Sequence, residues 1–504
     1  MGLSPTINIQ SGRGGADRRL LGWLLAVLVV SAALRLAPYW SGYRRVWFDQ
    51  DAWLHLRTVE TLRSLGPVGL LRAFHDRPLN QPDRWRSPFP PLVPALAAEA
   101  SFVAGVEWAV RLIPIMLWLL AAVWLYRLAR DWSVPAPDAI LAVALAGFSI
   151  EMVRQQGMHF APRAISALLG MGLLRSAYRL TQTGSFEPRR MAAVVWWAAL
   201  SAVGFGPNLF HIGTVVVLAA GWQQVAEGRR RVMPVVAALA AGLALALPFV
   251  LTTSVRLPSW SDYFAPAGGL PRLATLRDLA AYPLWIGLPA LLLAMAAVGP
   301  MAKACRARQP WAMWLAVWIG AIAPQTVVWL FVAPGPPFRL LVLLIPPLAI
   351  AAAVGFRALC GHLVISERQQ VAARAGVGLL TAAVTAAFLA WIEIPRRRIS
   401  DGEVEMYQAA ARLLPPGAAV HLRANLVFWY YCRDRFADLA MPVSPEHSSP
   451  DLAAGSYWLI SDREWRSGSP RRASYGKIVA SGQVLFTKED NRIVFLPASL
   501  GVTR

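Results

Sequence analysis

Two aspartates, Asp49 and Asp51, open a polar stretch that follows the first long apolar segment of the chain. Carboxylate oxygens are the ligands that hard divalent cations such as Mg²⁺ or Mn²⁺ prefer, and such a cation can also take phosphate oxygens. Without a metal, either carboxylate can act as a general base on a hydroxyl group. We therefore predict Asp51 and Asp49 as catalytic and metal-binding residues. The competing interpretation is a solvated loop with incidental acids.

A second polar stretch, residues 151–163, carries His159 between Arg154 and Arg163. A neutral imidazole nitrogen is a common metal ligand, so His159 is a candidate third ligand. Each arginine can bind a phosphate through its planar guanidinium fork. The alternatives left open are a polar surface histidine and two arginines that contact lipid headgroups.

A single arginine, Arg339, precedes the apolar run that begins at Leu340. A charge at such a position costs a few kcal/mol, on the order of 3, unless it is paired or reaches the membrane surface. Because a guanidinium matches phosphate oxygens bidentately, we predict that Arg339 binds substrate phosphate. The alternative is an arginine whose long side chain reaches up to the lipid headgroups.

The composition indicates that these residues belong to a membrane protein. The 504-residue chain is 56% hydrophobic and only 15% charged, whereas soluble domains carry about 25% charged residues. Apolar runs of about 17 residues or more recur, which is long enough to cross a bilayer. The net charge of +21 comes mostly from arginines in short connectors between these runs. That pattern is typical of membrane topology, so we expect a lipid bilayer as partner and no nucleic acid.

We predict an all-α polytopic domain of about eleven transmembrane helices plus one interfacial helix. The apolar segment 91–103 is short for a span and contains Glu99. If it crossed the membrane, the basic connectors would lie outside, against the positive-inside rule. We therefore place it at the interface and the N-terminus inside. The expected spans are 20–39, 107–128, 138–150, 164–180, 191–205, 208–226, 232–252, 282–299, 311–332, 338–358 and 375–393.

The charge rule divides the chain into three parts. Residues 1–19 form a cytoplasmic N-terminal segment, and residues 20–393 form the transmembrane domain with outer loops 40–90, 151–163 and 253–281. Residues 394–504 have ordinary polarity and are predicted as a small extracytoplasmic α/β domain. The elements expected in this domain are a helix over 403–414, strand-like runs at 419–421, 427–431, 457–460 and 477–479, and a hairpin of 483–487 with 492–496.

The first polar stretch resembles a known motif. Asp49-Gln-Asp51 followed by Ala-Trp-Leu-His55-Leu-Arg57 is similar to the first-loop motif of the oligosaccharyltransferase catalytic subunits, which are membrane glycosyltransferases of the GT-C class. Ser87-Pro-Phe-Pro-Pro-Leu and the run from Trp108 to Pro114 resemble later segments of that class. The resemblance covers about residues 40–130. It implies a GT-C fold, and it implies that His55 and Arg57 bind substrate together with Arg154, Arg163 and Arg339.

Other parts of the chain depart from the oligosaccharyltransferase pattern. Gly157 and His159 fit its second metal motif, but the expected aspartate is missing. The stretch 253–281 contains no glutamate, and the tail lacks a Trp-Trp-Asp motif. The tail instead resembles the small outer domain of the protein mannosyltransferase and aminoarabinose transferase group.

Together these resemblances imply a glycosyltransferase of the cell (inner or plasma) membrane. Its donor would be a polyprenyl-phosphate or polyprenyl-diphosphate sugar, and its acceptor a protein or a lipid or glycan on the outer face. A divalent cation, Mn²⁺ or Mg²⁺, would be the cofactor. Two alternatives stay open, a transporter or flippase of lipid-linked sugars and a catalytically inactive relative of the GT-C enzymes. No internal repeat of the transporter kind is evident in the sequence.

Overall fold

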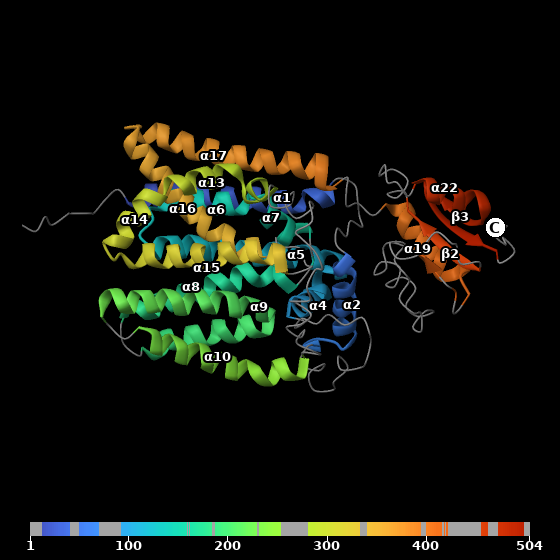
Figure 1. Ribbon diagram of the computed structural model, residues 1–504, viewed down its shortest axis with the longest axis horizontal. Helices are drawn as coiled ribbons and strands as arrows, with labels where there is room; N and C mark the ends of the chain where they lie inside the picture. The colour runs from blue at the N-terminus through green and yellow to red at the C-terminus, as the bar shows by residue number, and fades with distance from the viewer. Residues whose placement is uncertain are drawn as a thin grey trace, which may run out of the picture. The chain divides into compact units, whose positions relative to one another are not determined.

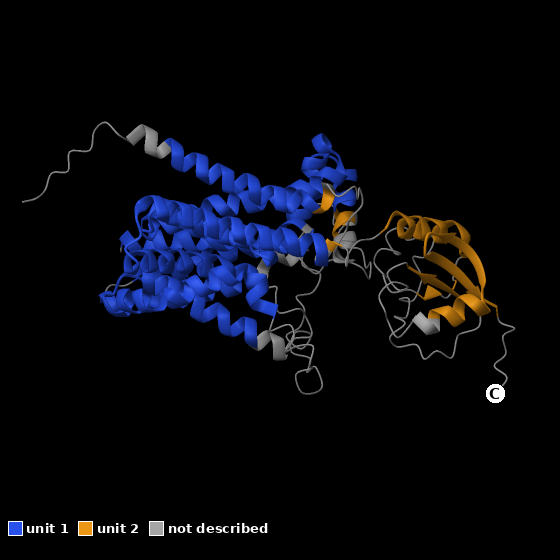
Figure 2. Cartoon of the chain, turned by 90° about the horizontal axis from the view of Figure 1, so that it is seen from above, with its two compact units in different colours: residues 1–37, 59–392 blue, residues 38–58, 393–504 orange. Residues whose placement is uncertain are grey.

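The computed structural model describes residues 13–40, 50–69, 92–158, 160, 162–183, 187–228, 231–253, 281–332, 340–394, 400–415, 418, 420–421, 455–461 and 472–497. The chain divides into two compact units, which Figure 2 colours separately. The first comprises Met1–Ala37 with Val59–Ile392, and the second comprises Pro38–Thr58 with Glu393–Arg504.

The first unit is a bundle of long apolar helices that lie side by side (Figure 1). Their apolar side chains make the bundle core, and many also face outward, as expected where the surroundings are lipid. The long helices are α1 (Arg13–Trp40), α5 (Val106–Asp131), α8 (Ser166–Thr183), α9 (Pro188–Glu227), α10 (Val232–Thr253), α15 (Pro310–Val332), α16 (Leu341–His362) and α17 (Glu367–Phe388).

Six helices of the described residues are long and apolar enough to cross a membrane, and up to eight if two bent helix pairs each form one span. One bent pair joins α6 (Ala136–Gly147) to the helical segment Ile150–Gly157, and the other joins α13 (Leu288–Ala296) to α14 (Val298–Arg306). The chain is therefore a multi-pass membrane protein. The number of eleven spans stays a prediction. The predicted interfacial segment 91–103 is a short apolar helix, α4 (Leu92–Ala104), which lies across the ends of the longer helices in Figure 1.

Small residues allow close helix packing in this bundle. A Cβ atom on Gly355 of α16 would lie 1.9 Å from the backbone oxygen of Leu293 in α13, and one on Gly172 of α8 would overlap the ring of Trp197 in α9. Close backbone approach at small residues is the usual way in which membrane helices gain packing energy.

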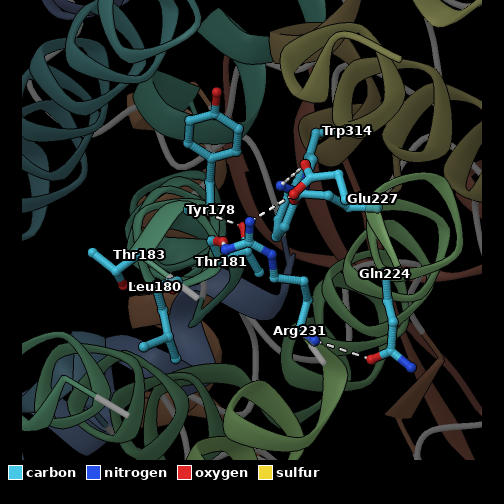
Figure 3. A network of polar contacts seen from close by, with 9 residues as sticks. Tyr178, Leu180, Thr181, Thr183, Gln224, Glu227, Arg231 and Trp314 are labelled. Carbon is cyan, nitrogen blue, oxygen red and sulfur yellow. Dashed lines mark hydrogen bonds and ion pairs between the residues drawn. The ribbon is translucent and has the colours of Figure 1, made fainter. Parts of the chain in front are cut away.

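One end of the bundle, which we call the basic end, is held by ion pairs near the predicted inner connectors. Arg231 pairs with Glu227 at 2.6 Å, donates to the carbonyl oxygen of Thr181, and donates its backbone N–H to Gln224 at 3.0 Å (Figure 3). These contacts join the end of α9 to the end of α8 and the start of α10. Arg231, which directly precedes α10, is thus held by its side chain as well as by its backbone N–H.

A second ion-pair group lies at the same end of α8. Asp131, the last residue of α5, accepts from Arg175 at 2.7 Å and from Arg179 at 2.8 Å. Because one carboxylate meets two guanidinium groups, this part of the basic end keeps a net positive charge. The placement of these connectors on the inner side stays a prediction from the charge rule.

The second unit contains a four-stranded sheet in the order β1-β2-β4-β3. Strand β1 (Val420–His421) pairs with β2 (Ser456–Ile460) in parallel, and the hairpin of β3 (Gln483–Lys488) and β4 (Asn491–Leu496) is antiparallel. The helix α19 (Asp401–Leu413) begins at Ser400, whose hydroxyl accepts from the N–H of Glu403 at 3.1 Å. The predicted α/β tail is therefore confirmed, while the predicted run 427–431 lies outside the described residues.

One predicted strand of this unit is wrong. Lys477–Val479 lies within the helix α22 (Arg472–Ser481). Tyr475 and Ile478, three residues apart, pack into one apolar cluster with Trp458, Ile460 and Val494 of the sheet. The three-residue spacing brings both side chains onto the same face of the helix, toward the sheet. The prediction was wrong because a run of three residues is too short for its periodicity to distinguish a strand from a helix.

The ring of His421 is packed inside the second unit. It stacks on Trp458 at 4.4 Å, and both ring nitrogens are buried with no hydrogen-bond partner among the described residues. Burial lowers the pKa of His421 below its ordinary value. Below a pH of about 6.5 the unfolded histidine therefore binds a proton that the folded one resists. We expect the stability of this unit to be constant above that pH and to fall below it.

Hydrogen exchange of the full chain at pH 7.5 and pH 5.5 tests this expectation. After correction for intrinsic rates, the amides of β2 should lose protection at the lower pH. A His421→Phe variant keeps the ring stack and should keep its protection. An equal loss in both proteins would show that another group is responsible.

Candidate functional site

The candidate site lies at the end of the bundle opposite the basic end, where α6 ends and α8 begins. After α6, the chain forms α7 (Ile150–Val153), a π-helical turn η2 (Arg154–Met158) and a 3-10 turn η3 (Pro162–Ile165). The helical segments on the two sides of the break are bent by 66°. The hydroxyl of Ser149 accepts from the N–H of Met152 at 3.4 Å and so caps α7. The stretch 151–163 was predicted as an outer loop, but its described residues are mostly helical and buried.

A buried ion pair stands at the start of this turn. Arg154 pairs with Glu151 at 2.8 Å, and the side chains are 3% and 0% exposed. Glu151 also accepts from the side-chain amide of Gln155, and the guanidinium of Arg154 lies over the ring of Trp285 at 5.6 Å. Arg154 was predicted to bind substrate, and here its charge is balanced by a carboxylate of its own turn. Sequence reasoning missed Glu151, although the i, i+3 spacing of Glu and Arg indicates such a pair.

Arg35 of α1 reaches the same turn and was also missed. It is fully buried, and its Nη1 donates to the carbonyl oxygen of Gly147 at 2.9 Å and to the hydroxyl of Ser31 at 2.7 Å. Its Nη2 lies 3.5 Å from Oε1 of Gln156, and its guanidinium lies over the ring of Trp118 at 4.7 Å. The bond to Gly147 satisfies a free carbonyl at the end of α6. Arg35 thus ties α1 to both sides of the break.

Gly157 allows η2 to lie directly against α1. A Cβ atom at this position would lie 2.8 Å from both Cβ and Cγ of Arg35. One residue earlier, Gln156 donates to the carbonyl oxygen of Ala164 at 3.3 Å and so joins η2 to η3. A glycine is therefore required where the turn meets Arg35.

Further polar side chains continue the site onto α8 and α9. Arg163 in η3 is buried. Asn208 of α9 donates to the carbonyl oxygen of Ser166, the first residue of α8, at 3.3 Å. One turn further along α9, His211 Nδ1 lies 2.5 Å from Oε1 of Gln325 in α15. These residues extend the polar layer from η3 to α15.

The helix α16 also begins at this end. A Cβ atom on Gly170, one turn into α8, would lie 3.5 Å from Leu343 near the start of α16. Leu340 and Leu341, which directly follow Arg339 in the sequence, are buried. Arg339 itself lies outside the described residues, and its predicted role stays a prediction.

The helix α2 (Gln50–Ser64) carries the first predicted motif. Asp51 is its second residue, where a carboxylate is favoured by the positive end of the helix dipole. His55 is buried. Beyond the end of α2, the N–H of Gly69 donates to Glu99 of α4 at 3.2 Å. Most of this polar stretch after Asp51 is therefore helical as far as Ser64.

The structure does not test the predicted metal site. Asp49 and His159 lie outside the described residues, as do the side chains of Asp51 and Arg57. Among the residues that are described, no group of three His, Cys, Asp or Glu side chains could hold a metal ion. Of the predicted site residues, Arg154 and Arg163 are both buried, in the neighbouring turns η2 and η3 between α6 and α8.

No protein-family model and no curated protein sequence matches the chain. Among solved structures, it is similar to ArnT from Cupriavidus metallidurans bound to undecaprenyl phosphate, with a TM-score of 0.57 and 15% identity over 96% of this chain and 98% of that chain. The apo form of the same protein gives a TM-score of 0.57 and 16% identity over 98% and 100% of the two chains.

The chain is also similar to the oligosaccharyltransferase of Archaeoglobus fulgidus in its apo form. The TM-score is 0.59 and the identity 12%, over 87% of this chain and 66% of that chain. A complex of that protein with Zn and sulfate gives a TM-score of 0.57 over 63% of its length. The expected GT-C fold is thereby confirmed.

Proposed function

We propose that this chain is a membrane glycosyltransferase that takes its sugar from a polyprenyl-phosphate or polyprenyl-diphosphate donor. The observation that carries the proposal is the likeness to ArnT bound to undecaprenyl phosphate, which extends over 96% of this chain. Supporting it, the bundle end at which α8 and α16 begin gathers buried arginines from separate elements. A guanidinium is the side chain best suited to a phosphate group.

The proposed reaction is a displacement at the anomeric carbon of the donor sugar. An acceptor oxygen or nitrogen forms a bond to that carbon, the bond from the carbon to the phosphate oxygen breaks, and the electron pair leaves with the phosphate. Asp51 or Asp49 takes the proton of the acceptor. Arg339 and Arg163 bind the phosphate, so that the leaving charge is stabilised by fixed cations. His55 and Arg57 would contact the substrate from α2.

A divalent cation would be held by Asp51 with Asp49 or His159, and when bound it would neutralise charge on the leaving phosphate. The oligosaccharyltransferase of Archaeoglobus fulgidus was crystallised with Zn.

Removal of divalent cations tests the role of a metal. Treatment of the purified protein with EDTA should reduce sugar transfer at least about tenfold, and Mn²⁺ or Mg²⁺ should restore it. If EDTA did not change the rate, the reaction would need no divalent cation, and Asp51 or Asp49 would act as a general base alone. Zinc-free buffer controls exclude rescue by contaminating metal.

Two other functions compete with this proposal. A transporter or flippase would move a lipid-linked sugar without breaking its bond to phosphate, and an inactive relative would do neither. Both differ from a transferase in their products. Mass spectrometry of lipid-linked sugars and surface glycans, in cells with and without the gene, should show an unused donor accumulating and one glycan modification missing. Unchanged glycans together with donor trapped on one side of the membrane would favour the flippase.

A further inference from the structure

Four buried arginines of the described bundle pair with a carboxylate, namely Arg111, Arg154, Arg175 and Arg231. Arg35 differs from these four, because no carboxylate of the described residues pairs with it. Among the described residues, Arg35 is bonded only to neutral groups, the two oxygens of Ser31, the carbonyl of Gly147 and, at 3.5 Å, the amide of Gln156. Its Nε has no hydrogen-bond partner among the same residues. Within the part of the chain that the structure describes, this positive charge is uncompensated.

Hydrogen bonds to neutral groups hold the guanidinium in place but leave its charge intact. A charge removed from water in this way is costly unless an opposite charge approaches it. The same low-dielectric surroundings also let its field extend further than in water. Arg35 is therefore a fixed source of positive potential beside η2, and the group it would stabilise is an anion.

We propose that Arg35 strengthens binding of the donor's phosphate through space, as a positioning residue that does not touch it. The inference rests on the proposed function, because it names the phosphate of the polyprenyl donor as the anion. Its location supports this role, since Gln156 lies in the turn between Arg154 and the predicted ligand His159. A diphosphate, with more negative charge, should gain more from Arg35 than a monophosphate.

The substitution Gln156→Glu tests the charge without removing Arg35. It keeps the size of the side chain and places a carboxylate beside the guanidinium, which would neutralise it. The substitution also removes the weak hydrogen bond from Gln156 to the carbonyl oxygen of Ala164, because a carboxylate cannot donate. Ser31→Asp neutralises Arg35 from a second side, and Arg35→Lys keeps the charge.

The matched control is Gln370→Glu at the basic end. Gln370 also accepts from an arginine, Arg374, at 3.4 Å, and Arg374 pairs with Asp138 at the opposite end of α6 from Gly147. This variant adds the same charge beside a guanidinium, but far from the candidate site. It should bind all lipids as the unchanged protein does.

Binding of undecaprenyl phosphate and of uncharged undecaprenol to the full chain, measured by native mass spectrometry, gives the readout. Gln156→Glu and Ser31→Asp should each weaken binding of the phosphate about tenfold and leave binding of the alcohol unchanged. Arg35→Lys should stay close to the unchanged protein. If both neutralising variants fold and bind the phosphate normally, or lose both lipids equally, the inference is overturned. Because binding needs no turnover, absence of sugar transfer would count against the proposed function and not against Arg35.

Discussion

Replacing Arg154 with methionine should lower the free energy of unfolding by about 3–5 kcal/mol, because it removes the guanidinium that balances the buried negative charge of Glu151. Glu151 is completely buried, so water cannot take over the role of the guanidinium. Removing both charges with Glu151→Gln and Arg154→Met together should restore most of the loss. Thermal and denaturant unfolding in detergent, run as a double-mutant cycle, measures the coupling.

The matched control is the pair Arg190 and Glu187, at 2.7 Å and each 37% exposed. An exposed pair of this kind is worth at most about 1 kcal/mol, so Arg190→Met should have a small effect. If Arg154→Met were no more destabilising than Arg190→Met, the ion pair would not hold the helical turn in place. In that case Arg154 would be available for substrate, as the sequence first indicated.

Asp51→Asn should reduce the rate of sugar transfer at least about 100-fold, since the amide keeps the size of the side chain but cannot accept the acceptor's proton. It is also a poorer cation ligand than a carboxylate. Because Asp51 lies in the first turn of α2, thermal unfolding is measured alongside the rate to separate a loss of helix stability from a loss of chemistry. Glu60→Gln, on the same helix, removes a carboxylate outside the proposed site and should change the rate about twofold or less.

Asp49→Asn should have an effect of the same kind. If Asp51→Asn and Asp49→Asn both transferred sugar at the unchanged rate, other residues would carry out the chemistry. A rate that fell in proportion to the folded fraction would show that these aspartates act on stability alone.

The bundle could be predicted from the sequence because a bilayer demands long apolar helices, and such runs are visible directly. The short segment that contains Glu99 is a separate helix, as its length indicated, while its place at the membrane interface stays a prediction. The helical turns after Gly147 were not predicted, because their polar residues were interpreted as a loop. They are buried instead, since Glu151 neutralises Arg154 and Gln156 bonds to Ala164. Such compensation depends on partners that the sequence pattern alone does not identify.

Arg35 was missed for a different reason. It lies near the end of an apolar run, where one arginine is easily assigned to the membrane surface. The available signal was its position inside the span, since an ionisable residue there indicates a function or a buried partner. Its acceptors, Gly147 and Gln156, are more than 100 positions away in the sequence. Only the packed bundle brings them together.

The central claim is that this chain breaks the bond between a sugar and a polyprenyl-linked phosphate. The most direct measurement adds a donor labelled in its sugar to membranes of cells that express the protein, which also hold the acceptor, and follows the labelled polyprenyl donor itself. We predict that the label passes from the polyprenyl donor to another molecule with the unchanged protein, and that Asp51→Ala and Arg339→Ala abolish this transfer. Label that remains on the polyprenyl donor, or equal transfer by both variants, would contradict the account.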